Sequence, residues 1–278
     1  MRSGETLGRG RAYSAYALPG YRFSVQSDIP AVSSCLERVF GLFPRSGAAS
    51  ANYVITAAGF GFTVEADHAA ALGFATLAET LEYVCWHASQ TSLATVDDEL
   101  AIHSAAVAAD GRALLIAGAS GAGKSTLTVE LLRHGLSFLS DEAVFLSLND
   151  GSVRGFPRAI ALVGGAPPES VSDSPISLGA KAYHTPGEFG AGVVHDRLPV
   201  EAIILLHQLD QKPGLVSVNP LHALPFLLGQ VFATGPAEVV LSAMTRLLSS
   251  TRVLSLKTDD PEAAAGEIAQ LLEASDAA

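Results

Sequence analysis

Apolar and polar residues alternate, or recur at helical spacing, along much of the chain, and these patterns predict its first elements. Tyr21 to Ile29 alternates between the two classes, which predicts a strand. Asn52 to Val64 is rich in aromatic and β-branched residues and is interrupted by Gly59 and Gly61, so it predicts strands joined by a turn or bulge. Thr76 to Ser89 carries apolar residues at helical spacing and predicts a helix.

A short polar stretch from Ser89 to Asp98 follows this helix and indicates a domain boundary. We therefore expect a smaller β-containing N-terminal domain over residues 1–95 and a second domain over residues 96–278. The first dozen residues are rich in glycine and arginine, and we expect them to be disordered. No apolar run follows their arginines, so they do not form a secretory signal.

The second domain opens with a hairpin that leads into a glycine-rich loop and a helix. The pattern predicts strands over Ala101–Ala109 and Arg112–Ala117 joined at Asp110–Gly111, a helix over Ser125–His134 that stops at Gly135, and a strand over Leu136–Leu139. A strand, a helix and a further strand in this order predict a βαβ unit, so the expected fold class is α/β.

The rest of the domain continues with strands and helices around one long irregular segment. Strands are predicted over Val144–Leu148, Val200–His207 and Arg252–Leu256, and helices over Pro220–Phe232, Pro236–Ser249 and Asp260–Ala274. The stretch from Gly164 to Gly192 is rich in glycine, proline and serine and is too long for an ordinary connection. We expect a functional loop, a lid or a disordered insert there.

The loop between the predicted strand and helix carries a phosphate-binding motif. The pattern GxxxxGK[ST] is met within the loop Gly118, Ala119, Ser120, Gly121, Ala122, Gly123, Lys124, Ser125 and Thr126. Its glycines let backbone N–H groups turn inward, and the following helix adds its positive dipole end. Lys124 can reach the β- and γ-phosphates of a nucleotide, and the Ser125 hydroxyl can bind Mg²⁺. The strand–loop–helix context argues against a chance glycine turn, so we expect a site for nucleotide phosphates and Mg²⁺.

A phosphate-bound Mg²⁺ also needs a carboxylate, and two places in the sequence can supply one. Asp141 and Glu142 directly follow the strand after the loop's helix, and the tip of that strand faces the phosphate loop in an open α/β sheet. Asp210 lies several residues beyond its apolar run and is typical of a turn, so we favour the acidic pair over it. One acid would hold the metal while the other accepts the proton of an attacking hydroxyl, and the sequence does not separate these roles. The alternative for the pair is a solvated loop.

Composition limits the partners of the protein. A formal charge of −11 at pH 7 disfavours nucleic acid and membrane surfaces as general partners. No apolar stretch approaches the ~20 residues of a membrane span. Cys35 and Cys85 lack metal-binding or redox spacing, so we expect buried, reduced thiols in a cytoplasmic protein.

Several of these segments occur together, in the same order, in one known family. His103-Ser104-Ala105-Ala106-Val107, the loop Ala119–Thr126, Arg133-His134-Gly135 and Ser140-Asp141-Glu142 make the chain resemble HPr kinase/phosphorylase. The match is closer to the shorter HPr-kinase-related proteins of bacterial gene clusters, and it is dense over residues 100–162. The phosphate loop alone is generic, and the ordered set of histidine, loop and acidic pair makes the resemblance specific.

The resemblance implies a P-loop kinase core of the HPr kinase type that phosphorylates a serine hydroxyl with ATP and Mg²⁺. It implies that Asp141 and Glu142 supply the catalytic carboxylate and a metal contact, and that His103 lies near the active site. The family's glutamate-arginine-glycine stretch is not recognisable here. Gly155-Phe156-Pro157-Arg158 occupies that place and keeps only Arg158, which leaves the second metal contact and phosphorylase activity open. Arg197 could bring a guanidinium to the leaving phosphate, although we favour a loop salt bridge for it.

We therefore expect an ATP-dependent serine kinase whose acceptor is a peptide or small protein. A lasso-peptide precursor is one candidate acceptor, by analogy with members of the shorter group. A kinase for a small molecule such as a sugar, and an ATP-binding regulator without catalysis, are the alternatives. The family's oligomeric habits also suggest a homo-oligomer. The sequence identifies neither the acceptor nor the oligomer.

Overall fold

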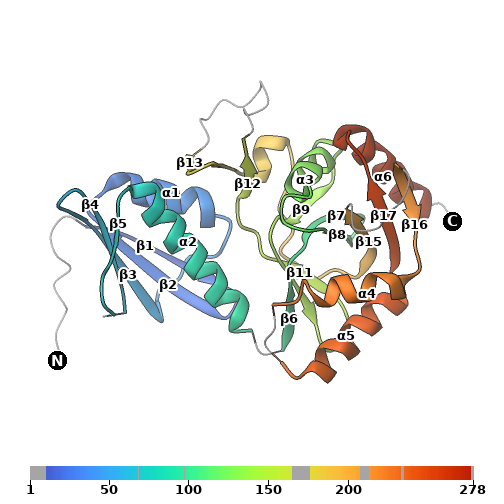
Figure 1. The fold of residues 1–278 in the computed structure, drawn as a ribbon, viewed down its shortest axis with the longest axis horizontal. Helices are drawn as coiled ribbons and strands as arrows, with labels where there is room; N and C mark the ends of the chain where they lie inside the picture. The colour runs from blue at the N-terminus through green and yellow to red at the C-terminus, as the bar shows by residue number, and fades with distance from the viewer. Residues whose placement is uncertain are drawn as a thin grey trace. The chain divides into compact units, whose positions relative to one another are not determined.

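The protein has a mixed α/β structure built from two compact units (Figure 1). The computed structural model describes residues 11–67, 69–96, 98–164, 176–206, 213–232 and 235–276. The described residues of Met1–Thr95 and Val163–Tyr183 form the first unit, and those of Val96–Leu162 and His184–Ala278 form the second. The segment Val163–Tyr183 lies within the second predicted domain by sequence but groups with the first unit.

A five-stranded sheet is the framework of the first unit. Its strands, in spatial order, are β1 (Ala12–Leu18), β2 (Tyr21–Ser27), β3 (Ala51–Ala58), β4 (Gly61–Ala66) and β5 (Leu72–Phe74). β2 and β3 pair in parallel, whereas the other neighbours are antiparallel. The strands predicted around Tyr21 and on both sides of Gly59 are confirmed. We expected the first dozen residues to be disordered, but β1 already begins at Ala12, so the expectation is wrong for that residue. Residues 1–10 lie outside the described part of the chain.

Two helices pack against this sheet and against each other. α1 (Pro30–Phe40) supplies the crossover that a parallel β2–β3 pair requires. α2 (Leu77–Ala94) starts with a capping box, in which the Thr76 hydroxyl accepts from the Glu79 N–H at 3.1 Å and the Glu79 carboxylate accepts from the Thr76 N–H at 3.0 Å. The helix runs to Ala94, past the predicted end at Ser89, because its last turns still bury side chains.

The long segment predicted as a loop, lid or disordered insert contains regular structure where it is described. β13 (Ile176–Leu178) and β14 (Lys181–His184) form an antiparallel hairpin, and the 3₁₀ helix η1 (Pro186–Phe189) follows. The alternative of a disordered insert over Gly164–Gly192 is therefore wrong from residue 176 onward, while a functional loop or a lid stays a prediction. Residues 165–175 lie outside the described part of the chain.

A six-stranded sheet forms the core of the second unit. Its strands, in spatial order, are β16 (Gly214–Ser217), β17 (Arg252–Lys257), β15 (Val200–Leu206), β8 (Arg112–Ala117), β7 (Ala105–Ala109) and β9 (Ser137–Ser140). β17, β15 and β8 are parallel to one another, and β7 lies antiparallel between β8 and β9. β8 and β9 therefore point the same way without being neighbours, so the predicted βαβ unit is corrected to one with an inserted hairpin strand.

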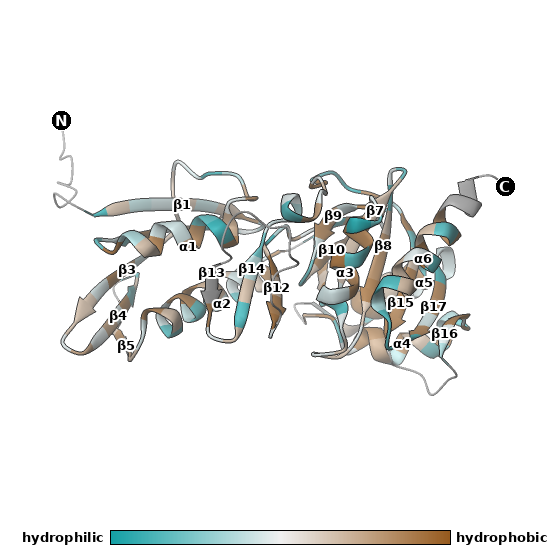
Figure 2. Cartoon of the chain, turned by 90° about the horizontal axis from the view of Figure 1, so that it is seen from above, coloured by the Kyte–Doolittle hydropathy of each residue, from teal (hydrophilic) through white to brown (hydrophobic). Residues whose placement is uncertain are grey.

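Helices cover both faces of this sheet (Figure 1). α3 (Lys124–Arg133) packs with α6 (Pro261–Asp276), and α4 (Pro220–Leu228) packs with α5 (Ala237–Ser250) on the other side. Apolar strands such as β8 and β17, brown in Figure 2, lie between these layers. α4 ends earlier than predicted, at Leu228 rather than Phe232. None of the described helices combines the length and apolar character that crossing a bilayer needs.

A smaller sheet completes the second unit. It consists of β11 (Val153–Gly155), β10 (Val144–Ser147) and β6 (Glu99–Ile102). The next strand along the chain, β12 (Ile160–Val163), is not part of this sheet. The single strand predicted over Ala101–Ala109 is wrong. The extended segment is interrupted at His103–Ser104, and the two strands on either side, β6 and β7, belong to different sheets. This break brings His103 to the end of a strand, next to the residues described below.

Candidate active site

The glycine-rich loop joins the end of β8 to the start of α3, as the sequence predicts. Gly121 and Gly123 have φ angles of 80° and 95°, in the left-handed region that glycine adopts without strain. A Cβ added at either position would meet nothing within 4 Å, so conformation rather than space requires glycine there. Gly118 is different, because its Cβ would lie 3.1 Å from side-chain atoms of Ala122 and Leu206.

Lys124 occupies the first turn of α3 and folds back over the loop. Its ammonium donates to the carbonyls of Gly118 at 2.8 Å and Ala119 at 3.3 Å. Burial lowers the pKa of this ammonium, while the carboxylates of Asp141 and Glu142 act in the opposite direction. Ser120, Gly121 and Thr126 are exposed, so the loop presents both its backbone and the N-terminus of α3 to solvent.

Asp141 lies directly after β9 and reaches the phosphate loop. Its Oδ2 accepts hydrogen bonds from the Ser125 hydroxyl at 3.1 Å and from the Ala161 N–H at 3.2 Å. Its Oδ1 is buried and has no hydrogen-bond partner among the described residues. Burial raises the pKa of the Asp141 carboxyl to about 7, against the lowering effect of these two hydrogen bonds. The proximity of this strand end to the loop is thus as predicted.

Glu142 points to a different partner from its neighbour. Its carboxylate forms an ion pair with the guanidinium of Arg158, whose side chain is 10% exposed. Arg158 follows the end of β11, where Gly155 packs so closely that an added Cβ would lie 2.0 Å from the Leu139 carbonyl oxygen. The structure therefore places Asp141, and not Glu142, beside Ser125. Both acids and Arg158 nevertheless belong to one cluster.

His103 joins the same cluster through the register of the small sheet. Ile102 pairs with Val144, which sets His103 beside the chain that precedes β10. The His103 Nδ1 lies 3.0 Å from the Glu142 carbonyl oxygen, and because a carbonyl only accepts, Nδ1–H is the donor. Burial, together with the positive charge of Lys124, lowers the pKa of His103 and favours the neutral ring.

Arg197 pairs with an acid of the small sheet. It forms an ion pair with Glu99 on β6, and Arg154 on β11 contacts the same carboxylate. This is the salt bridge that we favoured from the sequence. Asp210, the alternative acid, lies outside the described residues.

The donor set fits a nucleotide phosphate and a divalent cation. The fit rests on the buried, unpartnered Oδ1 of Asp141, on the Ser125 hydroxyl beside it, and on an ammonium that rests on loop carbonyls. Within the described residues no group of three or more His, Cys, Asp or Glu side chains could hold a metal alone. Mg²⁺ is commonly held by one or two protein ligands together with phosphate oxygens and water.

Sequence reasoning missed the Ala161 N–H, which holds the Asp141 carboxylate from β12. A backbone donor carries no side-chain signal, and only the fold brings it to this position. Together, Ser125 and Ala161 fix the orientation of Asp141 from two elements. The carboxylate is therefore preorganised relative to the loop.

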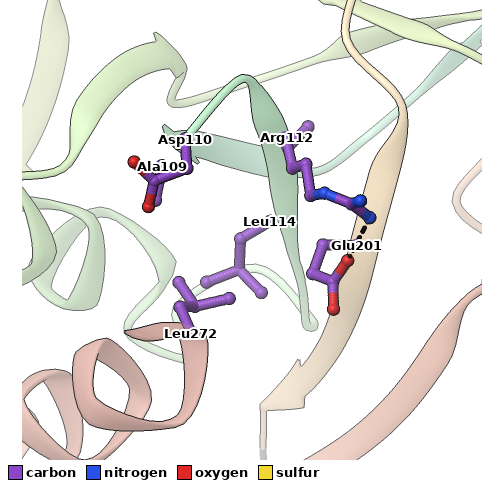
Figure 3. A pocket seen from close by; sticks show the side chains of 7 residues that line it. Ala109, Asp110, Arg112, Leu114, Glu201 and Leu272 are labelled. Carbon is purple, nitrogen blue, oxygen red and sulfur yellow. Dashed lines mark hydrogen bonds and ion pairs between the residues drawn. The ribbon is translucent and has the colours of Figure 1, made fainter. Parts of the chain in front are cut away.

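A small hollow lies near the start of β8, at the other end of that strand from the phosphate loop (Figure 3). It is lined by Ala109, Asp110, Arg112, Leu114, Glu201 and Leu272, and its volume of about 10 Å³ holds about one water molecule. Arg112 donates to Glu201 across it at 2.8 Å. Arg112 opens β8, whereas the phosphate loop follows the end of β8, so this hollow is separate from the candidate active site.

Comparisons with solved structures found similar chains. The chain is similar to a solved structure of the Hpr(Ser) kinase/phosphatase from Coxiella burnetii, with 18% identity and a TM-score of 0.34 over 63% of this chain and 95% of that one. No protein-family model and no curated protein matches the chain. A similarity at this level does not assign a substrate or an activity to the chain.

Proposed function

We propose that this protein is an ATP-dependent kinase that transfers a phosphoryl group to a serine hydroxyl of a peptide or small protein. The observation that carries the proposal is the contact between the Ser125 hydroxyl and Asp141 at 3.1 Å, beside a glycine-rich loop that carries Lys124. A loop for phosphates and a carboxylate for an attacking hydroxyl are the two parts that phosphoryl transfer needs.

In this proposal each residue has a stated task. Backbone N–H groups of Gly121–Thr126 and the Lys124 ammonium bind the nucleotide phosphates, which requires Lys124 to leave the carbonyls of Gly118 and Ala119. Ser125 and Asp141 hold Mg²⁺, which when bound neutralises charge on the phosphates. His103 supports Glu142 through its backbone carbonyl.

The transfer balances within this set of residues. The acceptor hydroxyl oxygen forms a bond to the γ-phosphorus, the bond from that phosphorus to the β,γ-bridging oxygen breaks, and ADP leaves. The hydroxyl proton passes to Oδ2 of Asp141, so that Oδ1, which has no partner among the described residues, is the oxygen that would hold the metal. Glu142 and Arg158 stay paired beside it and keep the second acid away from the Ser125 hydroxyl.

The test is mass spectrometry of candidate acceptors after incubation with the protein, ATP and Mg²⁺. The acceptors are a lasso-type precursor peptide, a small HPr-like protein and a set of hydroxylated metabolites. We expect one added phosphate on a serine, lost with Lys124→Ala and with Asp141→Asn. Asp150→Asn is the matched control, since Asp150 is an exposed acid that bonds Ser152 in the turn before β11.

Each other result contradicts a defined part of the proposal. Phosphate on a metabolite and on no peptide would replace the acceptor class. Nucleotide binding without transfer to any acceptor would make the chain a binding protein. Full transfer by Asp141→Asn would remove Asp141 from its role.

A further inference from the structure

An exposed group of aromatic rings lies on the first unit, where α2 meets the edge strand β5. Trp86 is 57% exposed, and Tyr83 and Phe74 are half-buried. The ring centroids of Phe74 and Tyr83 are 5.3 Å apart, and those of Tyr83 and Trp86 are 6.3 Å apart. We call these three rings the aromatic surface.

Buried groups hold the aromatic surface from beneath. The ring of Tyr83 lies 5.6 Å from that of His87, and His87 Nδ1 lies 2.7 Å from the hydroxyl of Tyr53, a buried core residue. The Tyr53 hydroxyl also lies 2.9 Å from that of Tyr21 on the next strand. A surface fixed in this way loses little conformational freedom when it binds a partner.

The strands β3, β4 and β5 and the helix α2 carry acidic residues and no lysine or arginine. No lysine or arginine occurs between Arg45 and Arg112, a stretch that includes β3, β4, β5 and α2. The part of this stretch that belongs to the first unit carries four acids, Glu65, Asp67, Glu79 and Glu82. Glu82 precedes Trp86 by one helical turn and Glu79 precedes it by two, so both lie on its stripe of α2. Among the other described cations of the unit, Arg22 lies on β2 and Arg38 on α1. Lys181 lies on β14, in the hairpin that contacts α2 and whose turn at Gly179 approaches the Glu82 carboxylate.

The same place offers a strand edge. β5 is the last strand of its sheet, and its Leu72 and Phe74 pair with Val64 and Phe62 of β4. Val64 is buried beneath the helices, so Leu72 and Phe74 share the face that α2 covers. An extended peptide added beside β5 would point alternate side chains toward Tyr83 and Trp86.

We propose that the aromatic surface, together with the Glu79 and Glu82 carboxylates, binds an extended basic segment of the acceptor peptide or protein. Aromatic faces attract guanidinium and ammonium groups, and the flanking carboxylates reinforce that attraction. The identification of the partner as the acceptor rests on the proposed kinase function. Binding of a basic peptide by this surface does not depend on the kinase function.

The sequence provides a reporter for the test, because Trp86 is the single tryptophan of the chain. The full-length Asp141→Asn protein is titrated, without ATP, with acetylated (Arg-Ser)₅ and (Glu-Ser)₅ peptides. We expect a saturable change in Trp86 emission with the basic peptide and none with the acidic one. Anisotropy of a fluorescein-labelled (Arg-Ser)₅ peptide measures the same affinity in variants that lack the tryptophan.

The variants separate this surface from general charge attraction. Trp86→Ala and the pair Glu79→Gln, Glu82→Gln are each expected to weaken (Arg-Ser)₅ binding at least about fivefold, whereas Trp86→Phe keeps it within about twofold because a ring remains. Tyr13→Ala is the matched control, since Tyr13 is 49% exposed on β1 at the other edge of the sheet. Its affinity should equal that of the unaltered surface.

Four results would overturn the proposal. The first is equal binding of both peptides, and the second is unchanged (Arg-Ser)₅ binding by Trp86→Ala. The third is a change in Trp86 emission when residues 1–10 are removed, which would assign the surface to the chain's own arginine-bearing start. The fourth is self-association in sedimentation that depends on Trp86. Kinase assays separate this proposal from the proposed function. If an acceptor is phosphorylated and Trp86→Ala leaves its KM unchanged, the docking surface is wrong and the kinase stands. If (Arg-Ser)₅ binds at Trp86 and no acceptor is phosphorylated, the binding surface stands and the kinase is wrong.

Discussion

Replacing Asp141 with asparagine should stabilise the metal-free protein at neutral and alkaline pH while abolishing transfer. Burial raises the pKa of the carboxyl from 3.8 to about 7, so the folded state holds this proton more tightly than the unfolded chain. Below pH 3.8 both states are protonated and the carboxyl costs nothing through ionisation. As the pH rises toward 7 the unfolded chain ionises first, and stability falls until both states are ionised.

The size of the effect follows from the two pKa values. At about 1.4 kcal/mol per pKa unit, the rise corresponds to about 4 kcal/mol above pH 7. This is an upper bound, since the side chain is half-buried and water screens part of the charge. Asparagine keeps an oxygen for Ser125 and Ala161 but places an amide where the unpartnered Oδ1 lay. We therefore expect a net gain of about 1–3 kcal/mol at pH 8 that shrinks toward pH 4.

The assay is urea unfolding in EDTA at several pH values between 4 and 8. Circular dichroism follows both units, while Trp86 fluorescence follows the first unit and serves as an internal reference that the substitution should not move. Glu142→Gln is the control of opposite sign, since it removes the anion that Arg158 contacts and should destabilise the protein. A difference between Asp141→Asn and the original protein that does not vary with pH would refute the reasoning.

Three further substitutions test other parts of the structure. Lys124→Ala should lower the affinity for Mg²⁺-ATP at least about tenfold in calorimetry, since it removes the charge that the proposal assigns to the phosphates; unchanged affinity would contradict that assignment. Gly155→Ala should destabilise the second unit by about 2 kcal/mol or more in urea unfolding, because the added Cβ would lie 2.0 Å from a backbone oxygen. Gly187→Ala is the control, since a Cβ at that position meets nothing within 4 Å. Thr76→Ala should lower the free energy of unfolding of the first unit by about 1 kcal/mol, because the capping box is lost. The Trp86 fluorescence transition should then occur at a lower urea concentration. A shift seen only in the circular dichroism of the second unit would contradict this.

The hydrophobic pattern predicted most elements whose signal is local. The hairpin at Asp110–Gly111, where φ is 49° and 73°, and the helix that stops at Gly135, where φ is 91°, follow from residue types that favour those conformations. α1 was missed although its signal was present, with Pro30 at its start and buried residues at helical spacing. β5 has only three residues, too few for an alternation to be recognised.

Features that depend on tertiary pairing could not be predicted. Residues 101–109 are almost uniformly apolar, and no glycine or proline marks the change from β6 to β7. The break is stabilised instead by Ser104, whose hydroxyl donates to the carbonyl of Ile116 at 3.0 Å, and by the pairing of β6 with β10. The neighbourhood of Ser125 and Asp141 was predictable because strand ends meet at a common edge. The pairing of Glu142 with Arg158 was not, because it depends on the path of the chain after β11.

The two acids of the site have the same chemistry but opposite surroundings, and this difference separates their roles. Glu142 is neutralised by a guanidinium and its backbone carbonyl orients His103, so it is satisfied before any ligand arrives. Asp141 has one oxygen held by Ser125 and Ala161 and one buried oxygen without a partner in the described structure. Lys124 shows the complementary state, since burial disfavours its charge, and the loop carbonyls and the carboxylates of Asp141 and Glu142 offset that effect only in part. Burial thus shifts both groups toward neutrality, and a bound dication and polyanion would restore both charges. In the proposed function, Asp141 and Lys124, which are poorly satisfied in the free protein, bind Mg²⁺ and phosphate, whereas Glu142 and Arg158 form their fixed support.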